Sequence, residues 1–383
     1  MKYLVQLENG MNRLFLPMGL LYLADALEKM GETVQIYHEL GDMEAINSLV
    51  AKVKADKPDW VGFSVMTSPQ LVPTIIASKK IKQEMDVPIV WGGLHVTMVG
   101  VDEPFVDVSV EGEGESWVTR QPVKHLDLFQ PAWHLIDCKK YGRTIHLVTS
   151  RGCPYRCGFC YSPAVWKRKW KSHTVQKVIE IFNSYPLEPE KVEFRDDNFF
   201  VDKKRGAEIV NKLGIPWSAA IRANMLSESL LKSLTVQPES LQIGVESASQ
   251  RLLNLVTKDM SVAKVWKALR LAHRYDINLF LTFIVNLPSE TEDEKEATLK
   301  MIERIKMEYS NVQCNVYEYF AFPKTALFNT ALQWGFNPPK TTLEWAQYAC
   351  TIWRKNAKWR KKHLGEDLEL NLDEVASNRK NDK

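Results

Sequence analysis

The sequence predicts an α/β protein: an N-terminal doubly wound parallel sheet, then a partial (βα)6 barrel, then a short helical C-terminal extension. Three observations lead to this prediction. Short β-branched runs alternate with amphipathic segments up to about residue 118, a second such series starts at Thr144, and a stretch without a long period separates them. We place the boundaries at 1–118 for the sheet domain, 119–143 for a linker, 144–322 for the barrel and 323–383 for the extension, whose charged end is expected to be disordered.

Composition narrows the class of protein. With 383 residues, 45% hydrophobic and 25% charged, the chain is long enough for two domains with separate cores. The formal net charge of +3 is too small to predict a nucleic-acid partner, and the basic run Trp166–Lys171 is more often a solvated face. No apolar run approaches the roughly 18 residues of a membrane span, and the chain opens into a strand rather than a signal peptide. We expect a cytoplasmic monomer with reduced cysteines.

The first domain is expected to alternate strands and helices, as parallel sheets do. The strands are Tyr3–Leu7, Thr33–Tyr37, Trp60–Val65, Ile89–Trp91 and Val106–Val110, and the helices are Gly19–Met30, Ala45–Ala55 and Leu71–Met85. Ligands of such sheets bind beyond the carboxyl ends of the strands. There the chain places loops rich in glycine and hydroxyl groups, for which ligand contact and ordinary turn chemistry are equally good explanations. These loops are Asn9–Asn12, Ser64–Ser68, Gly92–His95 and Glu111–Glu115.

The barrel is predicted from six further strands, near 145–150, 191–195, 215–221, 239–245, 277–285 and 312–320. Catalytic groups of such barrels lie at the carboxyl ends of the strands. Polar residues stand at these ends that could also be helix caps or structural ion pairs. Their convergence on one mouth favours a site. They are Arg195–Asn198, Arg222–Asn224, Glu246–Ser247 and Asn286.

Three cysteines, Cys153, Cys157 and Cys160, follow the first barrel strand with C-x3-C-x2-C spacing. Three thiolates on one short loop suit three corners of a cubic 4Fe-4S cluster, which leaves the fourth iron without a protein ligand. A structural zinc site is the alternative, but such a site needs four protein ligands. The other cysteines (Cys138, Cys314 and Cys350) are scattered and form no C-x-x-C pair.

The segment Ser150–Tyr161 resembles the cluster loop of the radical S-adenosylmethionine (SAM) enzymes. The resemblance implies that the open iron binds the amino and carboxylate groups of SAM, and that the reduced cluster splits SAM to give a 5'-deoxyadenosyl radical. It places Phe159 beside the adenine. It also implies an electron donor of the flavodoxin or ferredoxin type.

Later strand ends extend this resemblance. Phe194–Phe200 resembles the family's D-D-x-F segment, and Leu241–Ser247 resembles its G-x-E-S strand. The implied contacts to the SAM amino group, carboxylate and ribose come from Asp196, Arg222, Glu246 and Ser247, chemistry that carboxylate and guanidinium groups can supply. The segment Asn286–Thr291 departs at two glycines from the family's G-L-P-G-E-T, and Leu287 is the candidate there for a contact near adenine.

The first domain resembles the cobalamin-binding domain that precedes many radical SAM cores, through Leu16–Ala24, Val61–Met66, Pro88–Thr97 and Glu111–Glu115. The segment Glu8–Leu14 lacks the D-x-H-x-x-G pattern whose His ligates cobalt in mutases. The resemblance therefore implies base-off cobalamin without a protein His ligand, or a domain that has lost the cofactor. The cobalamin-binding candidates are Asn12, Ser64, Met66, Thr67, Gly92, Gly93, His95, Glu111 and Gly112.

The last strand, Val312–Phe320, carries polar or aromatic residues on both faces, which is unusual for a buried strand. Tyr317, Glu318 and Cys314 are the candidates to face a substrate, although packing roles explain each of them equally well. The function implied is cobalamin-dependent methylation of an unactivated carbon of a small molecule. The alternatives are a rearrangement, oxidation or ring closure without cobalamin, and a non-catalytic iron-sulfur redox or sensor protein. A methylthiotransferase fits less well, because residues 1–137 contain no cysteine.

Overall fold

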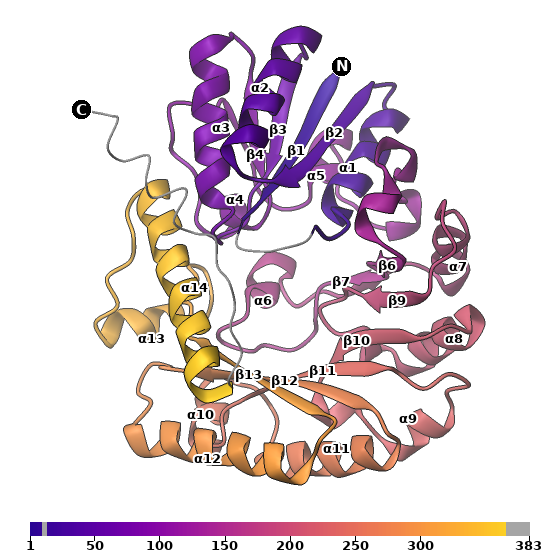
Figure 1. The fold of residues 1–383 in the computed structure, drawn as a ribbon, viewed down its shortest axis with the longest axis vertical. Helices are drawn as coiled ribbons and strands as arrows, with labels where there is room; N and C mark the ends of the chain where they lie inside the picture. The colour runs from indigo at the N-terminus through magenta and orange to yellow at the C-terminus, as the bar shows by residue number, and fades with distance from the viewer. Residues whose placement is uncertain (10–13, 365–383) are drawn as a thin grey trace.

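The structure is a computed structural model that describes residues 1–9 and 14–364. Two α/β parts are stacked, and the last helix runs along one side of both (Figure 1). The α/β class with two parallel sheets is confirmed. Disorder was predicted for the final twenty residues, of which 365–383 lie outside the described residues.

The first sheet has the strand order β2-β1-β3-β4-β5, and all its neighbouring strands are parallel. Side chains of β1 alternate between two faces: Val5 packs with helices α2 and α3, and Leu4 packs with α1. The order reverses between β1 and β3, so ligands are expected beyond the carboxyl ends of these strands. The strands are β1 (Lys2–Glu8), β2 (Val34–Leu40), β3 (Trp60–Ser64), β4 (Ile89–Gly92) and β5 (Val108–Val110); the helices are α1 (Met18–Lys29), α2 (Met43–Asp56), α3 (Leu71–Glu84), α4 (Leu94–Met98) and α5 (Gly114–Thr119).

The segment that follows α5 is packed against both domains. It contains short 3-10 turns at Leu126–Leu128, Trp133–Leu135 and Cys138–Tyr141. Leu126 and Trp133 are buried in the same hydrophobic cluster as Tyr22 of α1 and Ile145 of the barrel. The segment therefore joins the two parts through a shared core.

The second sheet is a half-barrel with the order β13-β12-β11-β10-β9-β6, again parallel throughout. The strand expected near 145–150 is divided: β6 ends at Leu147, and Ser150–Arg151 forms a separate ribbon, β7, antiparallel to β8 (Lys171–Ser172). The other barrel strands are β6 (Thr144–Leu147), β9 (Lys191–Phe194), β10 (Trp217–Ile221), β11 (Ser240–Glu246), β12 (Asn278–Val285) and β13 (Val312–Glu318).

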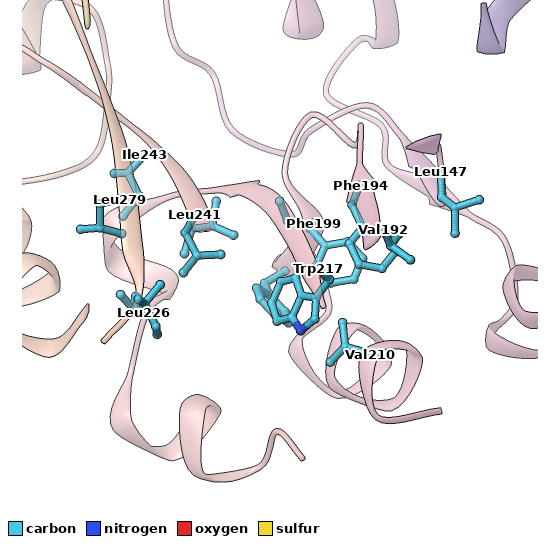
Figure 2. Close-up of a cluster of buried hydrophobic side chains, with 14 of the residues drawn as sticks. Leu147, Val192, Phe194, Phe199, Val210, Trp217, Leu226, Leu241, Ile243 and Leu279 are labelled. Carbon is cyan, nitrogen blue, oxygen red and sulfur yellow. The ribbon is translucent and has the colours of Figure 1, made fainter. Parts of the chain in front are cut away.

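Helices cover the outer face of the half-barrel and bury its core (Figure 1). In Figure 2, Phe194, Phe199 and Trp217 lie against one another beside Val210, and the rings of Phe194 and Phe199 are 4.0 Å apart between centroids. Replacing one such buried aromatic side chain by alanine lowers the free energy of unfolding by about 3–5 kcal/mol. These helices are α7 (Val175–Asn183), α8 (Lys203–Leu213), α9 (Glu228–Lys232), α10 (Gln250–Leu255), α11 (Val262–Arg274) and α12 (Glu292–Glu308). Helix α6 (Tyr161–Trp166) instead lies between the two α/β parts (Figure 1).

The C-terminal helices α13 (Phe328–Gln333) and α14 (Thr342–Leu364) extend the barrel. Helix α14 lies along β13, where Asn356 Oδ1 accepts a hydrogen bond of 2.7 Å from the Glu318 amide. Trp345 and Ala346 of the same helix are buried in the core of the first domain. The helix thus ties the two parts together. Among the described helices, none combines the length and apolar character needed to cross a membrane.

Candidate active site

The cluster loop, residues 152–160, is held in place by its backbone. The Gly158 amide donates to the Val256 carbonyl at 2.8 Å, and the Gly158 carbonyl accepts from the Leu327 amide at 2.8 Å. Gly152 has a φ of +85°, and a Cβ there would lie 2.1 Å from the Lys169 carbonyl oxygen, so only glycine fits. The thiols of Cys153, Cys157 and Cys160 are free and partly exposed.

The donor set fits an iron-sulfur cluster better than a single metal ion. In the described part of the chain, no three His, Cys, Asp or Glu side chains converge as they would around one ion. Zinc requires that convergence, whereas a cubic cluster takes one thiolate at each of three separate irons. The three cysteines would hold the cluster.

Arg222, at the end of β10, lies against the cluster loop. Its Nη1 donates to Cys157 Sγ at 3.2 Å, its Nη2 donates to the Lys258 carbonyl, and its guanidinium stacks 3.9 Å from the centroid of the Tyr155 ring. Its buried Nε has no hydrogen-bond partner among the described residues. A donor of this kind can take the carboxylate of a ligand, because guanidinium binds carboxylate with more than one N–H.

Glu246, at the end of β11, forms a buried ion pair with Lys258, with 2.5 Å between Nζ and Oε1. Its φ of +71° is a strained value for a non-glycine residue, which the surrounding structure must enforce. Lys258 Nζ also lies 5.6 Å from the centroid of the Phe159 ring. Glu246, Lys258 and Phe159 therefore form one corner of the barrel mouth. Sequence reasoning missed Lys258, since nothing in the pattern brings it to Glu246.

Ser247 does not face this corner. The side chain is fully buried, its Oγ lies 3.2 Å from Thr298 Oγ1, and it accepts a hydrogen bond of 3.0 Å from the Ser249 amide. These contacts tie the end of β11 to α12. Ser247 was predicted as one of the SAM contacts, but its side chain is turned into the protein.

Asp196 also turns inward. Its carboxylate accepts from the Thr149 amide at 2.6 Å, from the Thr149 hydroxyl at 2.7 Å and from the Ser150 hydroxyl at 2.5 Å. Burial raises its pKa, although these donors oppose the shift. Asp196 is almost fully buried, and these hydrogen bonds fix the approach to the cluster loop.

Its neighbour Asp197 points to the other side. Asp197 accepts from Tyr161 Oη at 2.5 Å and from Ser162 Oγ at 2.9 Å, directly after Cys160. The sequence contains this residue within the same D-D segment, and Asp197 rather than the predicted Asp196 lines the cavity between the domains. Strand alternation, which reverses the direction of successive side chains, is the signal that could have found it.

The apolar side of the mouth contains two predicted residues. Leu287 is buried in a small hydrophobic cluster against which Phe159 packs. The Leu287 amide donates to Glu290 Oε2 at 3.3 Å. This arrangement suits an apolar wall beside the loop.

The three candidates on β13 separate. Tyr317 is half-buried and paired in register with Ile284, and Glu318 accepts from Asn286 Nδ2 at 2.7 Å at the strand end. Cys314 does not reach the mouth, because it is buried in the hydrophobic core. Burial raises the pKa of its thiol to about 12. A protonated, enclosed thiol cannot meet a substrate, so Cys314 is removed from the candidates.

A cavity of about 320 Å³ joins the two domains. Its wall in the first domain is largely apolar, with Leu23, Trp60 and Trp117, and at the strand ends it includes the predicted residues Ser64, Gly92, Gly93 and Gly112. Its opposite wall includes residues beside the cluster cysteines: Ser150, Arg151, Tyr161 and Asp197.

Gly93 shows why glycine is needed at this wall. Its φ is +100°, and a Cβ would lie 2.9 Å from the Val65 carbonyl oxygen. The loops after β3 and β4 therefore approach each other closely at the cavity. A cavity that is apolar inside and has glycine backbone at its rim fits a bulky ring ligand such as a corrinoid.

Other predicted cobalamin residues lie away from the cavity wall. Met66 and Glu111 are exposed, and Thr67 is buried with its Oγ1 3.0 Å from His95 Nδ1. His95 is fully buried, and burial lowers its pKa to about 4, which keeps it neutral. It packs beneath the loop and does not line the cavity. Asn12 lies outside the described residues.

A buried charge cluster clamps the two domains beside the cavity. Arg151 pairs with Glu113 at 2.8 Å and with Glu115 at 2.6 Å, and Lys171 also pairs with Glu113. Burial disfavours the charge of Arg151, but Glu115 and Glu113 outweigh it and raise its pKa. Arg151 stands two residues before Cys153, so this cluster, which we call the clamp, links the first domain to the cluster loop.

Comparison with known families gives a match to each part. The radical SAM superfamily model matches residues 147–302, and the B12 binding domain model matches residues 13–120. The chain is a radical SAM protein with a B12-binding domain. The predicted family is thus confirmed, and the cofactors that go with these domains are a 4Fe-4S cluster, SAM and cobalamin.

Individual relatives span both domains. The protein named uncharacterized methyltransferase PH0819, from Pyrococcus horikoshii, is 27% identical over 380 residues, covering 87% of this chain and 81% of its own length. An anaerobic magnesium-protoporphyrin IX monomethyl ester cyclase from Cereibacter sphaeroides is 27% identical, covering 82% of this chain and 60% of its own length. The radical SAM methyltransferase TsrM from Kitasatospora setae, solved with tryptophan and a SAM analogue, has a TM-score of 0.68 at 16% identity, covering 85% of this chain and 75% of that one. This last likeness shows the shared fold.

Proposed function

We propose that this radical SAM protein is a cobalamin-dependent methyltransferase that acts on an unactivated carbon of a small molecule. The observation that carries the proposal is the shared cavity. Strand ends of the B12-binding domain form one wall, and residues flanking the cluster cysteines form the other. When bound, the cluster and cobalamin supply SAM cleavage to an adenosyl radical and methyl transfer, respectively.

The chain's own residues would hold and orient these groups. Cys153, Cys157 and Cys160 would bind the cluster, Arg222 would grip the SAM carboxylate with its unpaired Nε–H, and Glu246 would accept from the SAM amino or ribose groups. The ion pair with Lys258, 2.5 Å between Nζ and Oε1, holds the Glu246 carboxylate in place. Phe159 and Leu287 would form the apolar wall beside adenine.

The first domain would hold the corrinoid over the same space. Ser64, Gly92, Gly93 and Gly112 form the rim, and the apolar depth of the cavity excludes water from the ligand. No His lines this cavity within the described residues. The protein's contribution is alignment, since proximity of reactive groups contributes a large share of catalysis.

Methyl transfer can be tested directly. Protein reconstituted anaerobically with iron, sulfide and hydroxocobalamin is incubated with dithionite, methyl-labelled SAM and a panel of small molecules. The proposal predicts 5'-deoxyadenosine formation and label in a carbon-bound methyl group of one compound, both lost without cobalamin. Labelled product or 5'-deoxyadenosine that forms equally without cobalamin contradicts it.

The similarity to a cyclase gives ring closure as the second candidate. This reaction predicts a product of unchanged carbon count, without label from SAM. Mass spectrometry of the same reactions distinguishes the two, because methylation adds one labelled methyl group and ring closure adds none.

A further inference from the structure

The basic turn Lys167–Lys169 lies at the end of α6, and all three of its side chains are exposed. Lys167 and Arg168 both adopt left-handed backbone conformations, with φ of 50° and 60°. Each such residue costs roughly 1–2 kcal/mol relative to the right-handed form. The surrounding structure must therefore enforce this turn.

The cluster loop is what holds the turn. Arg168 Nε donates to the Pro154 carbonyl at 3.4 Å, and the Lys169 carbonyl lies so close to Gly152 that no Cβ would fit there. These two contacts bracket Cys153 in the chain. The basic turn is thus fixed on the segment that carries the first cluster ligand.

A fourth cation stands on the cluster loop itself. Arg156 lies between Cys153 and Cys157, and its side chain is 59% exposed, with Asp259 at 3.7 Å as its ion-pair partner. Within the described residues, no ion pair involves Lys167, Arg168 or Lys169, whereas the neighbouring Lys171 is neutralised by Glu113. The exterior of the cluster loop therefore carries a net positive charge that no other part of the site uses.

We propose that the basic turn and Arg156 form the docking surface for an acidic one-electron carrier protein. The inference rests on the proposed function, which requires the cluster to be reduced. In each encounter the carrier loses one electron and the cluster gains one, and no covalent bond forms or breaks. A carrier of the flavodoxin or ferredoxin class, with an acidic face, supplies that electron.

The physical chemistry of such encounters favours this surface. Electron-transfer complexes are small and transient, so long-range charge attraction contributes most of their association rate. Complementary charge raises association rates by about 10 to 1,000-fold at low salt. A cationic surface fixed on the cluster loop would bring the donor next to the segment that holds the cluster.

The test compares two reductants on full-length reconstituted protein. Lys167→Glu/Lys169→Glu reverses two charges and keeps Arg168, whose side chain anchors the turn. The matched control, Lys264→Glu/Lys267→Glu, reverses two exposed charges on α11, on the outer side of the barrel sheet (Figure 1). Formation of 5'-deoxyadenosine from SAM is measured with flavodoxin plus NADPH-dependent flavodoxin reductase, and separately with dithionite.

The proposal predicts a loss of about tenfold or more with subsaturating flavodoxin for the basic-turn variant. The dithionite-driven rate should be unchanged, and the α11 variant should match the unmodified protein with both reductants. Raising sodium chloride from about 50 to about 300 mM should slow only the flavodoxin-driven reaction, because salt screens exposed charges.

Equal flavodoxin-driven rates in the two variants would overturn the docking surface, as would a parallel loss with dithionite. Absence of 5'-deoxyadenosine from unmodified protein with dithionite would instead contradict the proposed function. Calorimetric titration with flavodoxin still tests the docking surface in that case. Weaker binding by the basic-turn variant alone supports it, and equal binding by both variants refutes it.

Discussion

Arg151→Met should destabilise the protein strongly, because it breaks the clamp between the domains. The side chains of Arg151 and Glu113 are each 13% exposed, and that of Glu115 is 6% exposed. Removing one partner of a buried ion pair costs about 3–5 kcal/mol, because the other charge stays buried and unpaired. We expect about 3 kcal/mol, the low end of this range, since Lys171 still neutralises Glu113. The buried Glu115 carboxylate, left without its partner, accounts for most of this cost.

The assay is urea unfolding followed by tryptophan fluorescence, with Arg143→Met as the control. Arg143 pairs with Glu190 on the surface, where the side chains are 54% and 62% exposed, and such pairs contribute about 0–1 kcal/mol. Adding Glu115→Gln to Arg151→Met should recover part of the loss, because it removes the unpaired carboxylate. If Arg151→Met and Arg143→Met shift the unfolding midpoint equally, the reasoning about the clamp is refuted.

Three further predictions concern the ligand loops and a buried histidine. Cys157→Ala should abolish 5'-deoxyadenosine formation while Cys138→Ala, at a packing position, retains it; activity in Cys157→Ala would contradict the cluster assignment. Gly93→Ala should lower corrinoid retention, measured by absorbance after desalting, because its Cβ would lie 2.9 Å from a carbonyl oxygen. Full corrinoid retention in this variant would contradict the assignment of Gly93 to the rim of the binding cavity. Burial holds the pKa of His95 at about 4 against 6.5, so the unfolded state binds more protons between these values and stability should fall by about 3 kcal/mol as pH drops from 6.5 to 4. His95→Gln should reduce that slope in urea unfolding, and an unchanged slope would refute the assignment.

The alternation of short β-branched runs with amphipathic helical segments predicted the fold well, because each βα unit has its own hydrophobic pattern in the sequence. The division of the first barrel strand was not predicted, since it depends on Thr149 and Ser150 being held by Asp196. No local sequence pattern indicates that contact.

The sequence predicted where the site lies better than it predicted which residues form it. Side chains of a strand alternate in direction, so a displacement of one residue moves a group from the mouth to the core. This explains why Asp197 rather than Asp196 faces the cavity. Cys314 lies in the core because it stands in the middle of β13, away from the strand end. Lys258 and Arg151 act through partners distant in sequence, which only the folded chain brings together.

Corrinoid content is the measurement that tests the shared cavity most directly. Protein reconstituted anaerobically with cluster and hydroxocobalamin is desalted, and cobalt and iron are measured per chain beside the visible spectrum. The account predicts a stoichiometric corrinoid together with a cluster, and SAM cleavage by the same sample after reduction. A chain that binds the cluster and cleaves SAM but retains no corrinoid would contradict it.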